Sequence, residues 1–129
     1  MKKDISFQPV KNVHVAIIKA EDGWKAHLLN RSPSLLENIM VTSRGYGETK
    51  TEKQETSVLR HLIPHLGPGE FALIEPIDES VFHLNNEYWV SYFINDQVFD
   101  KKYIFLPDSI IDDNLIVIEE MKLRGILHD

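Results

Sequence analysis

The length and composition of this chain fit one folded domain and exclude several kinds of site. With 129 residues, 43% of them apolar and 26% charged, residues 1–129 are expected to form a single domain around one hydrophobic core. The absence of cysteine excludes disulfides, thiolate metal sites and a cysteine nucleophile. The net charge of −6, with basic residues scattered mostly singly, argues against a nucleic-acid partner.

No segment of the sequence is expected to enter a membrane or to direct export. The basic residues after Met1 are not followed by an apolar run, so no signal peptide is predicted. No stretch approaches the roughly 18 apolar residues that a membrane-spanning helix needs. The hypothesis that follows is a cytoplasmic protein with no membrane partner, and the absence of cysteine agrees with it.

Apolar stretches recur about every ten residues and are separated by turn residues, which is typical of a β-sandwich or barrel. The first part of the chain contains the predicted strands Asn12–Ala20, Trp24–Asn30 and Leu36–Ser43. Alternate residues in each strand are apolar and should share one face. These residues are Val13, Val15 and Ile17, then Trp24, Ala26 and Leu28, then Ile39 and Val41.

The middle of the chain is its most polar and most ambiguous part. Arg44–Glu55 is predicted to be a long polar loop. Thr56–Ile63 has apolar residues at helical spacing, and Thr51 with Gln54 would form a capping box for a short helix ending before Pro64. Residues of this segment also suit a strand, so we favour a strand and keep the helix as the alternative.

The second half of the chain contains further predicted strands: Glu70–Pro76, Glu87–Asn95, Gln97–Leu106 and Asn114–Ile118. Glu87–Asn95 has large side chains on both faces, so it should be a central strand buried on both sides or covered by a loop. Glu119–Asp129 is either a terminal helical turn or a last strand. We therefore predict a mainly β protein, an antiparallel β-sandwich that can be immunoglobulin-like, with at most one short helix.

No residue pattern marks a catalytic, cofactor or metal site. His61 and His65 have the spacing of helical zinc ligands, but Pro64 interrupts a helix between them and no third ligand is near in the sequence. Gly45-Tyr-Gly47 lacks the third glycine and the following helix of a nucleotide loop. It is interpreted as a glycine-rich turn or a β-bulge. We therefore expect no catalytic residue, no cofactor and no metal.

Arg44 and Tyr46, in the polar loop, are the candidates for contact with a partner. Tyr46 stands between glycines where no core is expected, and an exposed aromatic side chain on a loop is a good contact residue. Trp89 is instead expected in the core, because aromatic residues on strands bury large apolar areas.

Several stretches together resemble a family of small bacterial proteins of about this length. They are Val41–Gly47, Thr56–His61, Glu75–Ile77, Asn86–Tyr92 and Asp100–Pro107. Members of that family are sometimes labelled as a subunit of phenylalanyl-tRNA synthetase, so the resemblance, which covers most of the chain, implies a translation-associated role. It assigns a function to no residue of this sequence.

Two hypotheses for the function follow. The first is a non-catalytic interaction or accessory module that binds another protein through the polar loop, because sandwiches commonly present loops and sheet edges to partners. The second is the translation-associated role implied by the resemblance, with tRNA or a synthetase as the partner. An exposed edge strand would allow a dimer, but no pattern in the sequence selects one.

Overall fold

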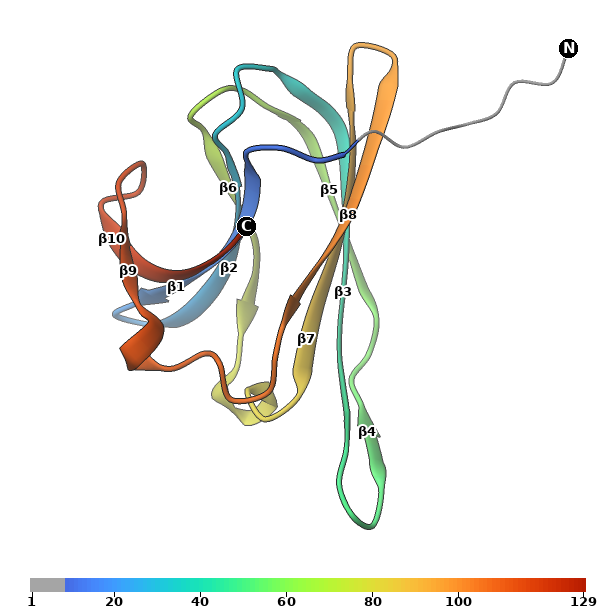
Figure 1. Ribbon diagram of the computed structural model, residues 1–129, viewed down its shortest axis with the longest axis vertical. Coiled ribbons are helices and arrows are strands. Elements are labelled where there is room, and N and C mark those ends of the chain that lie inside the picture. Colours follow the sequence, from blue (N-terminus) through green and yellow to red (C-terminus); the bar gives the residue numbers. More distant parts are fainter. Residues whose placement is uncertain (1–8) are drawn as a thin grey trace, which may run out of the picture.

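Strands form where the sequence alternates apolar and polar residues, and they assemble into two antiparallel sheets that pack face to face (Figure 1). The computed structural model describes residues 9–129. The expected mainly β sandwich is confirmed. Within the described residues, no helix has the length and apolar character needed to cross a membrane.

Each sheet is named after its central strand. The β1 sheet has the order β6–β2–β1–β10–β9, with β1 at Val13–Ala20, β2 at Gly23–Asn30, β6 at Phe71–Ile77, β9 at Ile116–Ile118 and β10 at Leu123–His128. The β3 sheet contains β3 at Leu36–Glu48, β4 at Lys53–Glu55, β5 at Leu59–Leu66, β7 at Asn85–Ile94 and β8 at Gln97–Phe105. Two short 3-10 helices, Glu79–Val81 and Asp112–Asn114, lie in the connections.

The expectation of a loop at 44–55 is wrong, because most of this segment is a β-hairpin. Strand β3 continues to Glu48, turns and returns as β4, so the hairpin projects beyond the sandwich (Figure 1). Tyr46 lies opposite Asn85 of β7 on one side and opposite Glu55 of β4 on the other. Pairing of the backbone on both sides stabilises the strand even though its side chains are polar.

The other ambiguous segments are also strands. The strand that we favoured at 56–63 is confirmed from Leu59 onwards, where β5 begins. Pro64 is tolerated inside β5 because this strand lies at the edge of the β3 sheet. Strand β6, at the neighbouring edge of the β1 sheet, contains Pro76. The C-terminal segment 119–129 ends in strand β10 rather than in a helical turn.

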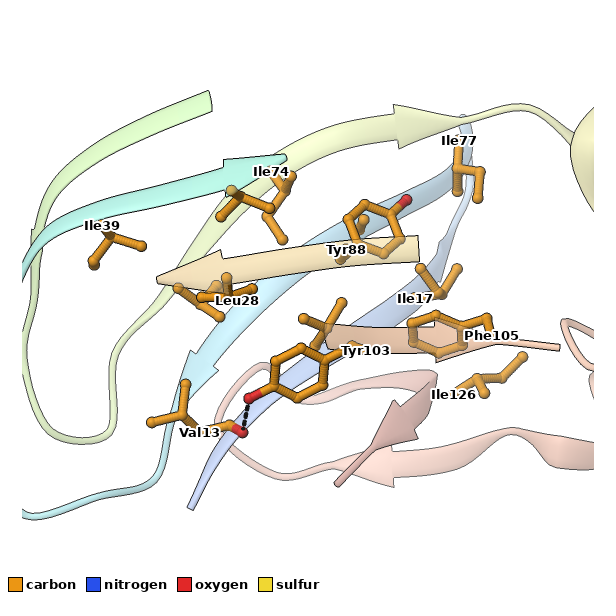
Figure 2. Close-up of a cluster of buried hydrophobic side chains, with 14 of the residues drawn as sticks. Val13, Ile17, Leu28, Ile39, Ile74, Ile77, Tyr88, Tyr103, Phe105 and Ile126 are labelled. Atoms are coloured by element: carbon orange, nitrogen blue, oxygen red, sulfur yellow. Dashed lines mark hydrogen bonds between the residues drawn. The ribbon is translucent and has the colours of Figure 1, made fainter. Parts of the chain in front are cut away.

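The core lies between the sheets and is built from the inward-facing residues of both (Figure 2). All the alternating residues predicted for the first three strands belong to it: Val13, Val15, Ile17, Trp24, Ala26, Leu28, Ile39 and Val41. The β3 sheet contributes Tyr88, Tyr92 and Tyr103, which are almost completely buried. The Tyr103 hydroxyl donates a hydrogen bond of 2.5 Å to the Val13 carbonyl and so links the two sheets (Figure 2).

A smaller apolar cluster shields the outer face of the β1 sheet. Ala16, Ile18 and Leu29 face away from the core and pack with Ile118 of β9. Strand β10 pairs closely with β1, since a Cβ atom on Gly125 would lie 2.6 Å from the Ile18 Cδ1. Glycine at this position permits the close approach. The C-terminal hairpin therefore both extends and covers this sheet.

Replacing Tyr103 by phenylalanine should lower the free energy of unfolding by about 1 kcal/mol, because the Val13 carbonyl loses a buried donor. Tyr92→Phe is the matched control, since Tyr92 is equally buried but its hydroxyl bonds to no described residue. Urea denaturation of the two variants measures the difference. Equal losses in both would show that the cross-sheet bond contributes nothing.

Two partly buried histidines should make the fold less stable in acid. Burial lowers the pKa of both His14 and His27 below the ordinary value of 6.5, and Arg31 lowers that of His14 further. The unfolded chain therefore binds protons that the folded chain does not. Their contribution to stability is fully present above about pH 6.5 and is lost as the pH falls through the lowered pKa values.

The melting temperature of the double variant His14→Gln/His27→Gln should therefore fall less between about pH 7 and pH 5 than that of the wild type. The exposed His65 supplies the control, because His65→Gln should follow the wild type. Thermal melts at the two pH values check this expectation. A double variant that remains as acid-sensitive as the wild type would contradict it.

Candidate functional site

The outer face of the β3 sheet exposes aromatic side chains that were expected to be buried. Along β7, Tyr88, Val90 and Tyr92 point into the core, whereas Trp89 and Phe93 point outward. Trp89 is 43% exposed and Phe93 is 38% exposed. The expectation that Trp89 lies in the core, on a strand buried on both faces, is therefore wrong. The reason is that no described element packs on this side of the sheet (Figure 1).

These side chains belong to a mainly apolar patch, the apolar face, formed by Met40, Leu62, Trp89, Phe93 and Val98, with the polar Thr42 and Ser91 between them. The register brings them together, since Met40 lies opposite Leu62 and Phe93 lies opposite Val98. Leu62 is 77% exposed. The other four line a shallow depression of about 430 Å³. An exposed, mainly apolar patch of this kind marks a contact site.

Charged groups of both signs border the apolar face. The Lys102 ammonium lies 4.7 Å from the centre of the Trp89 ring, a cation–π contact. The Trp89 Nε1–H donates to the Asp100 carboxylate on the neighbouring strand. Arg60, opposite Thr42, forms no ion pair with a described residue. These contacts orient the indole ring, and they leave Arg60 available for a partner.

The predicted contact residues Arg44 and Tyr46 lie on β3 and enclose a buried carboxylate, that of Glu87 on β7. Glu87 is 4% exposed. Its Oε2 accepts from Arg44 Nε at 3.1 Å, and its Oε1 accepts from the Tyr46 hydroxyl at 3.4 Å. The Arg44 guanidinium also stacks on the Tyr46 ring, 4.7 Å from its centre. Glu87 raises the pKa of Arg44, and burial together with Glu87 raises the pKa of Tyr46.

Gly45 and Gly47 lie in the regular part of β3, so the turn or bulge expected for them is wrong. A Cβ atom on Gly45 would lie 3.0 Å from Thr56 Cγ2, and one on Gly47 would lie 3.1 Å from Leu84 Cδ2. The glycines thus let neighbouring side chains approach the strand. The Gly45 N–H also donates to Thr56 Oγ1 at 2.7 Å, which fixes the chain where it leaves β4.

A polar cluster lies between the sheets on the side where β5 and β6 form the edges. The pairing of β6 with β2 shifts at a β-bulge between Leu73 and Glu75, which places Glu75 opposite the core residue Ala26. Bulges redirect side chains in this way. Glu75 Oε1 accepts from Ser43 Oγ at 2.5 Å and lies 2.7 Å from His61 Nε2. Side chains from three strands and both sheets therefore meet at one oxygen.

This cluster forms one wall of a cleft of about 310 Å³ that opens between segments 56–59 and 75–78. Tyr88 and Asn86 line the cleft from β7, and Leu59 and Ile77 supply apolar surface at its sides. The Tyr88 ring stands beside β6, with its hydroxyl directed away from β7 toward the side of Ile77 (Figure 2). The cleft thus combines apolar walls with a few polar groups, which is typical of small-molecule sites.

The Ser43–Glu75–His61 arrangement is not a catalytic triad. The carboxylate lies between the other two groups, whereas a triad needs the imidazole to bond the nucleophile. His65 lies on the same strand as His61, about 13 Å further along it, so the two cannot share a metal ion. Among the described residues, no group of three histidine, aspartate or glutamate side chains could hold a metal ion.

No family model, curated protein or solved structure matches this chain. The function is therefore argued from the residues themselves. The sequence singled out Arg44 and Tyr46 as candidate contact residues, which stays a prediction, and it did not indicate the outward position of Trp89 or the cluster around Glu75. Large residues on both faces of the strand at 87–95 were the available signal for Trp89. Glu75 carried no signal, because the bulge that turns it inward leaves no mark in the sequence.

Replacing Arg44 by alanine should lower the melting temperature, because the buried Glu87 carboxylate loses its cation. Arg60→Ala is the matched control on the same sheet face and should leave the melting temperature unchanged. Adding Glu87→Gln to Arg44→Ala should recover part of the loss. Circular dichroism melts distinguish the three proteins. If Arg44→Ala and Arg60→Ala melt alike, the ion pair has no structural role.

Proposed function

We propose that this chain is a non-catalytic interaction module that binds another protein through the apolar face of the β3 sheet. The observation that carries the proposal is the exposure of Leu62, Trp89 and Phe93 on a sheet that no described element covers. Aromatic residues and methionine are enriched in protein interfaces, and tryptophan is a common hot spot. Arg44 and Tyr46, at the border of the face, extend the proposed contact surface.

The chemistry of the face suits a folded protein with an apolar patch of its own. Apolar side chains make up most of the depression, which Thr42, Ser91 and Asp100 also line, and Arg60 and Lys102 lie beside it. Protein interfaces combine apolar and polar groups in this way. Arg60 and Lys102 at the rim can meet carboxylates of the partner, while Asp100 can meet a cation. This mixture of signs does not select a polyanion such as a nucleic acid.

Two finer assignments belong to the same proposal. Strand β2 pairs with β6, β3 with β7 and β7 with β8, which supports an immunoglobulin-like topology. The cysteine-free composition supports a cytoplasmic location. Because sandwiches of this kind host many functions, the proposed binding rests on the apolar face and not on the fold.

The translation-associated role is the competing proposal, and it requires bound tRNA or a bound synthetase. The distribution of charge speaks against a tRNA surface. Among the described residues, the lysines and arginines that form ion pairs with carboxylates are Lys19, Lys25, Arg31, Arg44 and Lys53. With 20 acidic against 14 basic residues and a net charge of −6, the chain as a whole repels phosphates rather than attracting them.

Affinity purification of the tagged protein at low salt should recover one protein in stoichiometric amount. Leu62→Ser and Trp89→Ser should each weaken its capture by about tenfold or more, because hot-spot side chains dominate binding. Leu62→Ser should change the free energy of unfolding by less than about 1 kcal/mol, since Leu62 is 77% exposed. Trp89→Ser should cost more, because Trp89 is 43% exposed and the rest of its side chain is buried.

Val117→Ser is the control, because Val117 is 55% exposed but lies on β9 of the other sheet. It should leave capture unchanged. Bound RNA and protein are both identified in the eluate. Capture that survives Leu62→Ser and Trp89→Ser would exclude the apolar face, and tRNA or a synthetase in the eluate would favour the translation-associated role.

A further inference from the structure

The cleft between 56–59 and 75–78 contains polar groups whose hydrogen-bonding capacity the chain itself does not fill. Tyr88 is 2% exposed, and its hydroxyl makes no hydrogen bond with any described residue. Among the described residues, the one buried side-chain polar atom without a hydrogen bond is His14 Nδ1. The Tyr88 hydroxyl is therefore open to solvent, and the cleft that it lines is its route. A buried tyrosine usually finds a partner for this group.

Two further oxygen atoms of residues that line the cleft accept no hydrogen bond from a described residue. Glu75 Oε1 is occupied by Ser43 and His61, whereas Glu75 Oε2 accepts nothing from a described residue. Asn86 donates both hydrogens of Nδ2 to backbone carbonyls, at 3.0 and 3.2 Å. Its Oδ1 accepts none from the described residues. The cleft residues thus leave a carboxylate oxygen, an amide oxygen and a phenol oxygen as acceptors.

Two carboxylates, those of Glu75 and Asp78, are among the groups that line the cleft, and Glu75 Oε1 lies 2.7 Å from His61 Nε2. Arg44 also lines the cleft, but its guanidinium is bonded to Glu87. Burial, with a smaller contribution from Glu75, raises the pKa of Tyr88, so its hydroxyl stays neutral at physiological pH. An acceptor-rich site lined by carboxylates selects a cation with several N–H donors, and an ammonium group has three of them.

We propose that this cleft binds a small organic amine, with its ammonium group on Glu75, Tyr88 and Asn86. Leu59, Ile77 and Val81 provide apolar walls for the body of the ligand. A volume of about 310 Å³ corresponds to about ten water-sized groups at roughly 30 Å³ each, which is enough for a small organic molecule. An alkyl or aryl-alkyl ammonium has both the size and the polarity that these groups match. The cleft lies between the sheets, so this site is separate from the apolar face.

Titration of the ¹⁵N-labelled protein with benzylamine, followed by ¹H–¹⁵N NMR spectroscopy, tests the proposal. Saturable shifts are expected at Gly45 and Ile77, with a Kd of about 1 mM or tighter. Benzyl alcohol and benzoate have the same ring without the positive charge, and each should bind about tenfold more weakly. Equal binding of either compound, or the absence of saturable shifts at millimolar benzylamine, would overturn the assignment.

Two variants assign the contacts. Glu75→Gln should weaken the binding of benzylamine by about tenfold, because the carboxylate supplies the charge-assisted hydrogen bond. Tyr88→Phe keeps the ring in the core, removes only the hydroxyl and should weaken binding several-fold, so it tests the site even if Glu75→Gln fails to fold. Val117→Ser, on β9 away from the cleft, is the control and should bind benzylamine like the wild type. Unchanged affinity in Tyr88→Phe, or in a folded Glu75→Gln, would refute the proposed contacts.

Discussion

The register between β3 and β7 is the constraint on which the rest of the β3 sheet depends. It places Val41 opposite Val90 in the core and Thr42 opposite Trp89 outside. Side chains alternate with a period of two, so a slip of one residue would move Trp89 into the core and Tyr88 out of it. Because β3 pairs with β7 on one side and with β5 and β4 on the other, these pairings fix the inner and outer faces of the sheet and place Ser43 and His61 of the polar cluster.

The two sheets differ in how their outer faces meet water. The C-terminal hairpin shields the β1 sheet, where Ile118 packs on Ala16 and Ile18. The β3 sheet has no such cover among the described elements, and Leu62 and Trp89 remain in contact with solvent. Full burial of a large apolar side chain stabilises a protein by about 1.5–3 kcal/mol. The isolated chain does not gain this stabilisation for the exposed parts of Leu62 and Trp89, and a partner that buries them would provide it.

The sequence was sufficient for the features that depend on local alternation. It predicted the strands of the first part of the chain and their inward residues, such as Val15 and Leu28, because burial on one face imposes a period of two. The sequence did not predict the features that depend on pairing between strands far apart in the chain. The polar residues after Arg44 form a strand only because β7 and β4 lie on either side of it. Trp89 is exposed because the strands that follow β8 join the β1 sheet and leave the outer face of the β3 sheet uncovered by any described element. Glu75 points inward because of the bulge in β6.

The prolines in β5 and β6 have a consequence for how this molecule meets other chains. Pro64 and Pro76 interrupt the row of N–H donors on the two neighbouring edges. The remaining edges among the described strands are β4 and β9, with three residues each, and β8, which carries Lys101 and Lys102. An extended segment of another chain could pair with an exposed edge strand through backbone hydrogen bonds, but the prolines interrupt that pairing. The same interruption disfavours the edge-to-edge stacking of strands that builds fibrils. Recognition is left to side chains, whose shapes can discriminate one partner from another.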